Sequence, residues 1–163
     1  MSRATRAIRE PLLNQQAPDT TNPAVIQRLS RGLPAGIRML EHMGLNREQQ
    51  AWLLGLSARS LQRAGAGNGP ELTQDQLTRL SLVVGIYKAL HILYDDAAAD
   101  GWLRRANRRH PFVGQTPLDY MSRGGIPAMY EVRRLLDADR SGMFSVTPEA
   151  RKAASNFGTV VDL

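Results

Sequence analysis

The sequence contains no cysteine, which excludes a disulfide framework and any metal site built from thiolates. Histidine is scarce, and His42, His91 and His110 lie far apart with no Asp or Glu at the spacing of a metal-ligand motif. No Ser–His–Asp triad can be argued from the order of these residue types. We therefore predict no metal, no cofactor and no enzymatic activity.

Long hydrophobic runs are also absent. The longest apolar stretch, residues 82–94, contains Gly85, Lys88 and His91, so it is too short and too polar to span a bilayer. The N-terminus carries arginines but no apolar segment of the length that a secretory signal needs. We therefore expect a soluble intracellular protein without a membrane partner.

Aromatic residues make up 6% of the chain and apolar residues 42%, so aliphatic side chains must fill most of the core. No segment shows the alternation of apolar and polar residues that is typical of a strand. Helix starts recur instead, such as Asn22-Pro23 and Thr116-Pro117, where a capping residue precedes a proline. These patterns predict an all-α fold.

Composition divides the chain into four segments. Residues 1–21 are rich in Gln, Asn, Thr, Pro and Arg, and we expect a flexible arm there. Residues 22–96 hold the first group of predicted helices, and residues 97–144 hold a second, smaller helical module that continues from the first. Residues 145–163 form a C-terminal tail.

One predicted helix, residues 77–93, is apolar nearly all round and includes Leu80 and Ile86. A helix without a polar face needs cover on every side, so we expect it to be central. Thr73 is its predicted cap, and residues 95–101 after it are interpreted as a polar break. Further along, Gly124-Gly125 is predicted to separate the last two helices.

Residues 47–64 fit the helix-turn-helix motif that binds DNA. The motif needs a small residue where its two helices touch, and Ala51 stands there. It needs a residue that tolerates a positive φ in the turn, and Gly55 follows four positions later. Leu54, Leu56 and Leu61 are placed to pin the pair to the core. The alternative interpretation is a plain helical hairpin, and Gln50 departs from the motif because an apolar residue is common at its position.

The second helix of this motif would present its polar side chains to DNA. An exposed Arg can bind guanine and a Gln can bind adenine, while Gln49 or Gln50 near the start of the first helix could bind a phosphate. The predicted DNA-binding residues are Gln49, Ser57, Arg59, Ser60, Gln62 and Arg63. A single short helix reads few bases, so we expect a homodimer or a larger assembly on DNA.

The net charge of +6 is distributed unevenly. Residues 101–123 contain five arginines and one acidic residue, whereas residues 124–163 contain five residues of each sign. Basic charge carried almost entirely by Arg favours a polyanionic partner, although an arginine cluster can equally be a solvated face. For Arg104, Arg105, Arg108 and Arg109 the sequence leaves a protein partner, phosphate and water open.

The helix-turn-helix segment, residues 43–63, together with the helix that follows, resembles the Xre/MbcA/ParS antitoxin family. The sequences WLRRAN at 102–107, FVGQTPLDYM at 112–121, GGIP at 124–127 and VRRLLD at 132–137 resemble that family's toxin-binding signature, in the same order. Three features depart from the family pattern. Ala106 stands where Pro is frequent, Val113 stands where Gly is frequent, and the loop carries additional residues Arg108, Arg109 and His110.

The resemblance implies a bacterial cytoplasmic antitoxin that binds a RES-type, NAD-degrading toxin encoded in the same operon and represses that operon. The alternative is a helix-turn-helix regulator without a toxin partner. The positions that match the signature, and that we therefore predict to bind toxin, are Trp102, Arg104, Arg105, Phe112, Gln115, Thr116 and Asp119. Packing is the competing role for Trp102, and helix initiation is the competing role for Thr116.

The tail places apolar residues at a chain end, among them Phe157 and Leu163. They can dock on the protein's own surface or on a partner, and we favour the partner. We expect the tail to reach towards the toxin's active-site cleft, where Asp162 and the terminal carboxylate could meet cationic groups.

Overall fold

The computed structural model describes residues 19–145, and every regular element within that range is a helix. The elements are α1 (Pro23–Ser30), α2 (Leu33–His42), α3 (Arg47–Leu54), α4 (Ala58–Gly65), α5 (Gln74–Leu93), α6 (Asp96–Gly101), the short 3-10 helix η1 (Trp102–Arg104) and α7 (Pro117–Ser145). The predicted all-α fold is confirmed. The predicted arm and tail lie almost entirely outside the described residues.

Side-chain caps explain where most helices begin. The Asn22 side chain accepts a hydrogen bond from the Ala24 N–H, and Pro23 follows as the first helical residue. Asn46 and Thr73 each form a capping box with the Gln three residues later, at the starts of α3 and α5. These caps are local sequence signals, which is why the sequence predicts these starts.

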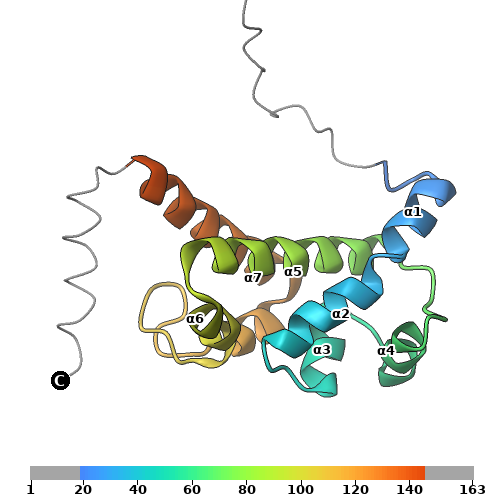
Figure 1. Cartoon of the computed structure of the whole chain (residues 1–163), viewed down its shortest axis with the longest axis horizontal. Coiled ribbons are helices and arrows are strands. Elements are labelled where there is room, and N and C mark those ends of the chain that lie inside the picture. Colours follow the sequence, from blue (N-terminus) through green and yellow to red (C-terminus); the bar gives the residue numbers. More distant parts are fainter. Residues whose placement is uncertain (1–18, 146–163) are drawn as a thin grey trace, which may run out of the picture.

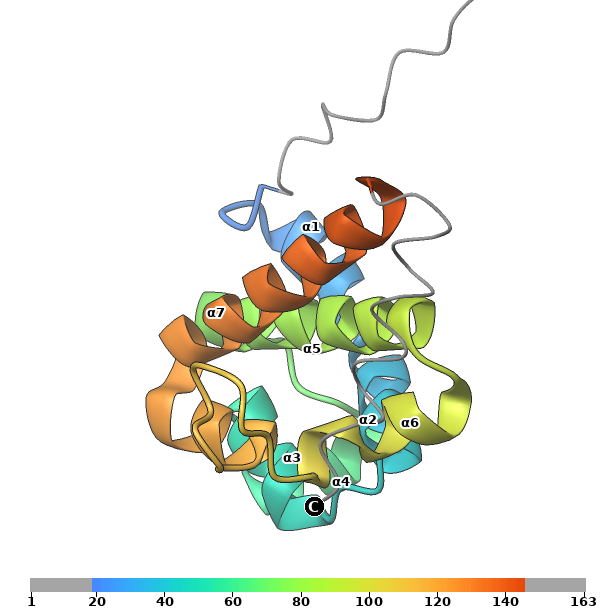
Figure 2. The same ribbon diagram turned by 90° about the vertical axis from the view of Figure 1, so that its left-hand side faces the viewer.

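Helix α5 lies at the centre of the molecule, as predicted. It contacts α1, α2, α3, α6 and α7. Figure 1 shows α5 running along the middle, and Figure 2 shows the C-terminal part of α7 on one side of it and α2, α3 and α6 on the other. Leu90 and Ala89 are completely buried in α5. The N-terminal and C-terminal helices therefore share one core.

The prediction of a polar break at residues 95–101 was wrong, because Asp96–Gly101 forms α6. Asp95 is its cap, since the carboxylate accepts a hydrogen bond from the Ala98 N–H at 2.8 Å. Asp100 on α6 contacts His91 of α5 through a ring nitrogen at 3.0 Å. The Asp95 cap and the contact between Asp100 and His91 together stabilise this helix of six residues. A helix this short does not show a clear apolar period in the sequence.

Helix α7 is two helical segments joined at a kink. Gly125 has φ 62° and ψ −148°, which is outside the helical region, and Pro127 follows it. The break predicted at Gly124-Gly125 is therefore present. After the kink, Met129, Val132 and Leu136 are buried against the core.

Gln50 is a buried polar residue of α3, and this burial explains its departure from the apolar pattern. Its side chain is 3% exposed, and its amide nitrogen donates to the Leu45 carbonyl at 2.8 Å. A buried amide with a partner can replace an apolar side chain at low cost. The proposed contact of Gln50 with a phosphate is wrong, because the side chain has almost no surface to offer.

Replacing Gln50 by Ala should lower the free energy of unfolding by about 1–3 kcal/mol, because the Leu45 carbonyl loses its buried donor. Urea unfolding followed by circular dichroism measures this change. Gln27→Ala, at an exposed position of α1, is the matched control and should change stability by less than about 0.5 kcal/mol. Equal midpoints for the two variants would contradict the structural role of Gln50.

Candidate functional site

Helices α3 and α4 form the helix-turn-helix pair, joined by a turn at Gly55. Gly55 has φ 64°, the left-handed conformation that the motif requires and that glycine adopts without strain. Leu54 and Leu56 on either side of the turn are buried, and so is Leu61 of α4. The predicted pinning of the motif to the core is thus present in the structure.

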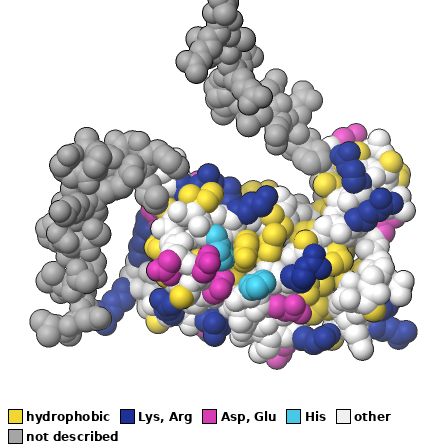
Figure 3. All heavy atoms as spheres, in the orientation of Figure 1, with side chains coloured by type: hydrophobic (Ala, Val, Ile, Leu, Met, Phe, Trp, Pro, Cys, Tyr) yellow, Lys and Arg dark blue, Asp and Glu magenta, His cyan; other side chains and the backbone are white. Residues whose placement is uncertain are grey.

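The polar face of α4 lies on the outside of the molecule. Arg59, Gln62 and Arg63 are exposed, and their spacing of three and four residues places them on one side of the helix. In the space-filling view, basic side chains gather at the end formed by α1 and α4, where Arg28 and Arg31 of the α1 region are also exposed (Figure 3). Such a surface suits the phosphates and base edges of DNA.

Three other predicted DNA-binding residues take part in caps. Ser57 is the cap of α4, and its hydroxyl accepts from the Ser60 N–H at 3.0 Å and contacts the Ser60 hydroxyl at the same distance. Gln49 belongs to the capping box of α3, where its side-chain oxygen accepts from the Asn46 N–H at 2.9 Å. These residues fix where α3 and α4 begin, and they thereby stabilise the helix-turn-helix.

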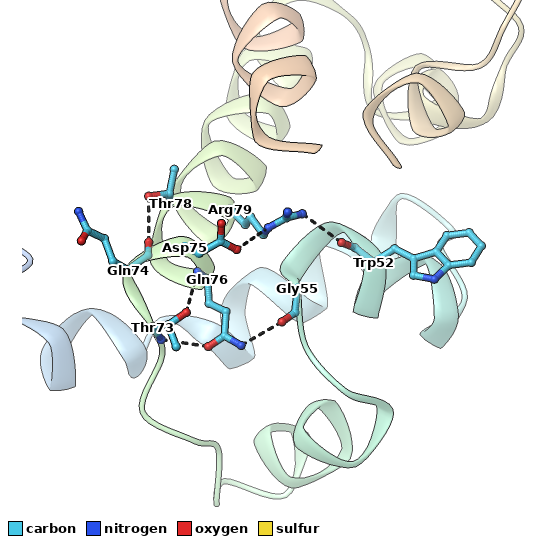
Figure 4. A network of polar contacts seen from close by, with 8 residues as sticks. All are labelled: Trp52, Gly55, Thr73, Gln74, Asp75, Gln76, Thr78 and Arg79. Atoms are coloured by element: carbon cyan, nitrogen blue, oxygen red, sulfur yellow. Dashed lines mark hydrogen bonds and ion pairs between the residues drawn. The ribbon is translucent and has the colours of Figure 1, made fainter. Parts of the chain in front are cut away.

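The start of α5 holds the turn of the motif from outside (Figure 4). The Gln76 amide donates to the Gly55 carbonyl at 2.9 Å, and Arg79 donates to the Trp52 carbonyl at 3.3 Å. Arg79 is itself held by Asp75 at 2.9 Å. No local pattern points to Gln76 and Arg79, because their partners are 21 and 27 residues away along the chain.

A surface cavity of about 620 Å³ lies where the helix-turn-helix meets the kink of α7. Trp52, Arg79, Asp119, Arg123 and the Gly124-Gly125 kink are among its lining residues. Trp52 is 55% exposed, which is unusual for so large an apolar side chain. The predicted residue Asp119 therefore lines a cavity shared with Trp52 of α3.

The residues 102–120 are organised around Phe112, which is completely buried. Its ring packs edge-on against Trp102, with centroids 5.7 Å apart, and against Tyr120, at 5.5 Å. Trp102 is partly buried, so it contributes to packing while retaining some exposed surface. Phe112 supports the surface loop by packing beneath it. Because its own side chain is completely buried, it has no surface with which to contact toxin.

The arginine cluster is largely tied to the protein itself. Arg104 donates from Nε to the Met43 carbonyl at the end of α2 at 2.8 Å, and Arg105 donates to the Ala97 carbonyl at 3.4 Å. Arg109 forms a bidentate ion pair with Asp139 of α7, in which its two terminal guanidinium nitrogens lie 2.6 and 2.8 Å from the carboxylate oxygens. All three residues are still exposed, so these bonds orient side chains that also face solvent, and Asp139 balances the charge of Arg109.

Thr116 and Gln115 lie at the start of α7. The Thr116 hydroxyl accepts from the Asp119 N–H at 3.1 Å, as a helix cap does, and Gln115 lines a second surface cavity of about 410 Å³ with Tyr120 and Glu131. The remaining predicted toxin-binding residues, Phe157, Asp162 and Leu163, lie outside the described residues.

Three groups in residues 94–120 have shifted pKa values. Burial raises the pKa of the Tyr94 phenol, and the nearby Asp139 carboxylate adds to the rise. Hydrogen bonding to Asp139 raises the pKa of Arg109. The hydrogen bond from Tyr120 to Glu131 raises the pKa of the Tyr120 phenol. Each shift favours the protonated form that the group already has at neutral pH, so none prepares a general base.

Within residues 19–145, no group of three or more His, Cys, Asp and Glu side chains is placed to hold a metal ion. None of the helices in that range combines the length and the apolar character that a membrane crossing requires.

Comparison with known proteins divides the chain at α5. Residues 24–85 match the antitoxin Xre-like helix-turn-helix domain, and residues 88–142 match the antitoxin Xre/MbcA/ParS C-terminal toxin-binding domain. The uncharacterized protein y4oB of Sinorhizobium fredii is 37% identical over 116 residues, which are 71% of this chain and 88% of that protein. No solved structure matches the chain. With both domains present in order, the chain belongs to the Xre/MbcA/ParS antitoxins, with a DNA-binding helix-turn-helix followed by a toxin-binding domain.

Proposed function

We propose that this antitoxin neutralises a RES-type, NAD-degrading toxin encoded in the same operon and represses that operon through its helix-turn-helix. The observation that carries the proposal is the joining of the two matched domains through one central helix, α5. Helix α4 and the loop between η1 and α7 lie towards opposite ends of the long axis in Figure 1. That separation allows one molecule to bind operator and toxin together.

We propose that the two helical segments of the chain bind different partners. Residues 22–96 bind the operator, mainly through Arg59, Gln62 and Arg63, and residues 97–144 bind the toxin. The tail (145–163) is proposed to add to toxin binding. Because α4 is short, we propose that a homodimer within a larger toxin–antitoxin complex reads two half-sites. The protein acts by binding and needs no cofactor.

The proposal predicts that NAD is protected in cells. Expressing the neighbouring RES-type reading frame alone should deplete NAD and stop growth, and co-expression of the full antitoxin should restore both. The Arg59→Ala/Arg63→Ala variant is the matched control, because it should lose operator binding and still protect NAD. Depletion of NAD despite a stable, co-expressed antitoxin would contradict the proposal and favour a regulator without a toxin partner.

The role of the tail can be tested in the same cells with a chain that ends at Phe144. We expect this chain to co-purify with the toxin and to protect NAD less well, because the segment proposed to approach the cleft is missing. Full protection by the shortened chain would assign toxin inhibition to residues 97–144 alone.

A further inference from the structure

Val113 combines two features that a side chain serving its own fold does not need. It is 73% exposed, more than any other large apolar side chain among the described residues. Its φ is 49°, and no other non-glycine residue in that range has a positive φ. A β-branched side chain is a poor fit to the left-handed region because its Cβ crowds the backbone. The position therefore stores strain without a compensating contact in the core.

The loop around Val113 is held rigidly. The Gly114 N–H donates to the Asn107 carbonyl at 2.8 Å, and the Asn107 N–H donates to the Gln115 carbonyl at 3.0 Å, which closes the loop at its base. The N–H groups of Phe112 and Val113 both donate to the Arg109 carbonyl. With Phe112 buried beneath it, the loop cannot turn Val113 inwards without breaking these bonds.

The surroundings of Val113 indicate a partner of particular chemistry. Arg108 of the same loop is exposed, whereas the charge of Arg109 is balanced by Asp139, and the loop lies within the matched toxin-binding domain, residues 88–142. An exposed apolar side chain near a cationic one complements an apolar depression bordered by a carboxylate. The loop lies far from α4 in Figure 1, at the other end of the long axis, so DNA held by α4 is not the partner it faces.

We propose that Val113 is a docking anchor that inserts into an apolar depression on the toxin, and that its strained conformation is retained for this contact. The inference rests on the proposed function, because the toxin is the partner it names. Strained residues persist where binding uses them, since an unstrained residue would otherwise serve the fold better. Val113 then contributes to the choice of toxin, as an exposed side chain on a rigid loop can.

Val113→Asn tests both the backbone strain and the apolar contact with the toxin. Asn tolerates a positive φ, and it lacks the apolar methyl groups of Val. We expect its melting temperature to rise by about 2–6 °C as the strain is relieved. We expect its Kd for the purified toxin to rise about tenfold, the factor for removing two buried methyl groups. Val113→Ile keeps both the strain and the apolar contact, so its affinity should stay within about threefold of the wild type.

Ile92→Ala, at an exposed position of α5, is the surface control and should change neither quantity. Unchanged toxin affinity in Val113→Asn would overturn the anchor, and an unchanged or lower melting temperature would overturn the strain. A loss of operator affinity with toxin affinity intact would assign Val113 to DNA binding and overturn the proposal. The wild-type titration tests the proposed function separately: absence of toxin binding there would remove the partner itself.

Discussion

Replacing Ile86 by Ala is expected to lower the free energy of unfolding by about 2–5 kcal/mol. Ile86 is 2% exposed in the middle of α5, where α2, α3, η1 and α7 meet. The space left among the side chains there is only about 10 Å³, so the truncation opens a new cavity. Because both matched domains share this core, the loss should weaken the whole described fold in one transition.

Urea unfolding followed both by circular dichroism and by tryptophan fluorescence measures this effect. Trp52 lies on α3 and Trp102 on η1, so fluorescence reports on the helix-turn-helix side and on the toxin-binding side. Ile92→Ala is the matched control on the same helix, where the side chain is 46% exposed, and should cost less than about 0.5 kcal/mol. Two separate transitions, or equal losses for the two variants, would contradict a single shared core.

The Arg59→Ala/Arg63→Ala variant is expected to lose most of its affinity for the operator. Both side chains are exposed on one face of α4, and each Arg that binds a base is worth about 1–3 kcal/mol. For Arg59→Ala alone this corresponds to a Kd roughly 5 to 150 times higher, with relaxed preference at one base pair. Fluorescence anisotropy with the promoter fragment, at one fixed salt concentration, measures both quantities.

Arg134→Ala removes an exposed positive charge from α7 and is the control for a nonspecific effect of charge. It should leave the Kd for the promoter nearly unchanged. If the double variant binds the promoter as tightly as the wild type, Arg59 and Arg63 are not the residues that read DNA. Thermal melting of each variant confirms that a loss of binding is not a loss of folding.

The helix starts and the helix-turn-helix could be predicted because their causes are local. Asn46 and Thr73 cap helices through the Gln three residues later, and Gly55 is needed by the turn itself. The central position of α5 also follows from the sequence, since a helix apolar on all sides must be covered. Helix α6 was missed because its period is too short to recognise and its contact with His91 is tertiary.

The sequence by itself determined all the helices except α6, their order and the family, because caps, apolar periods and ordered motifs depend on residues that are neighbours in the chain. Tertiary structure alone decided which polar residues are available to a partner. It buried Gln50 against the Leu45 carbonyl and tied Arg109 to Asp139, 30 residues away. It also exposed Val113 in a closed loop and gave it a positive φ. The reason is physical: exposure, ion pairing and strain depend on which segments pack together, and no local pattern encodes the partner of a side chain that lies many residues away.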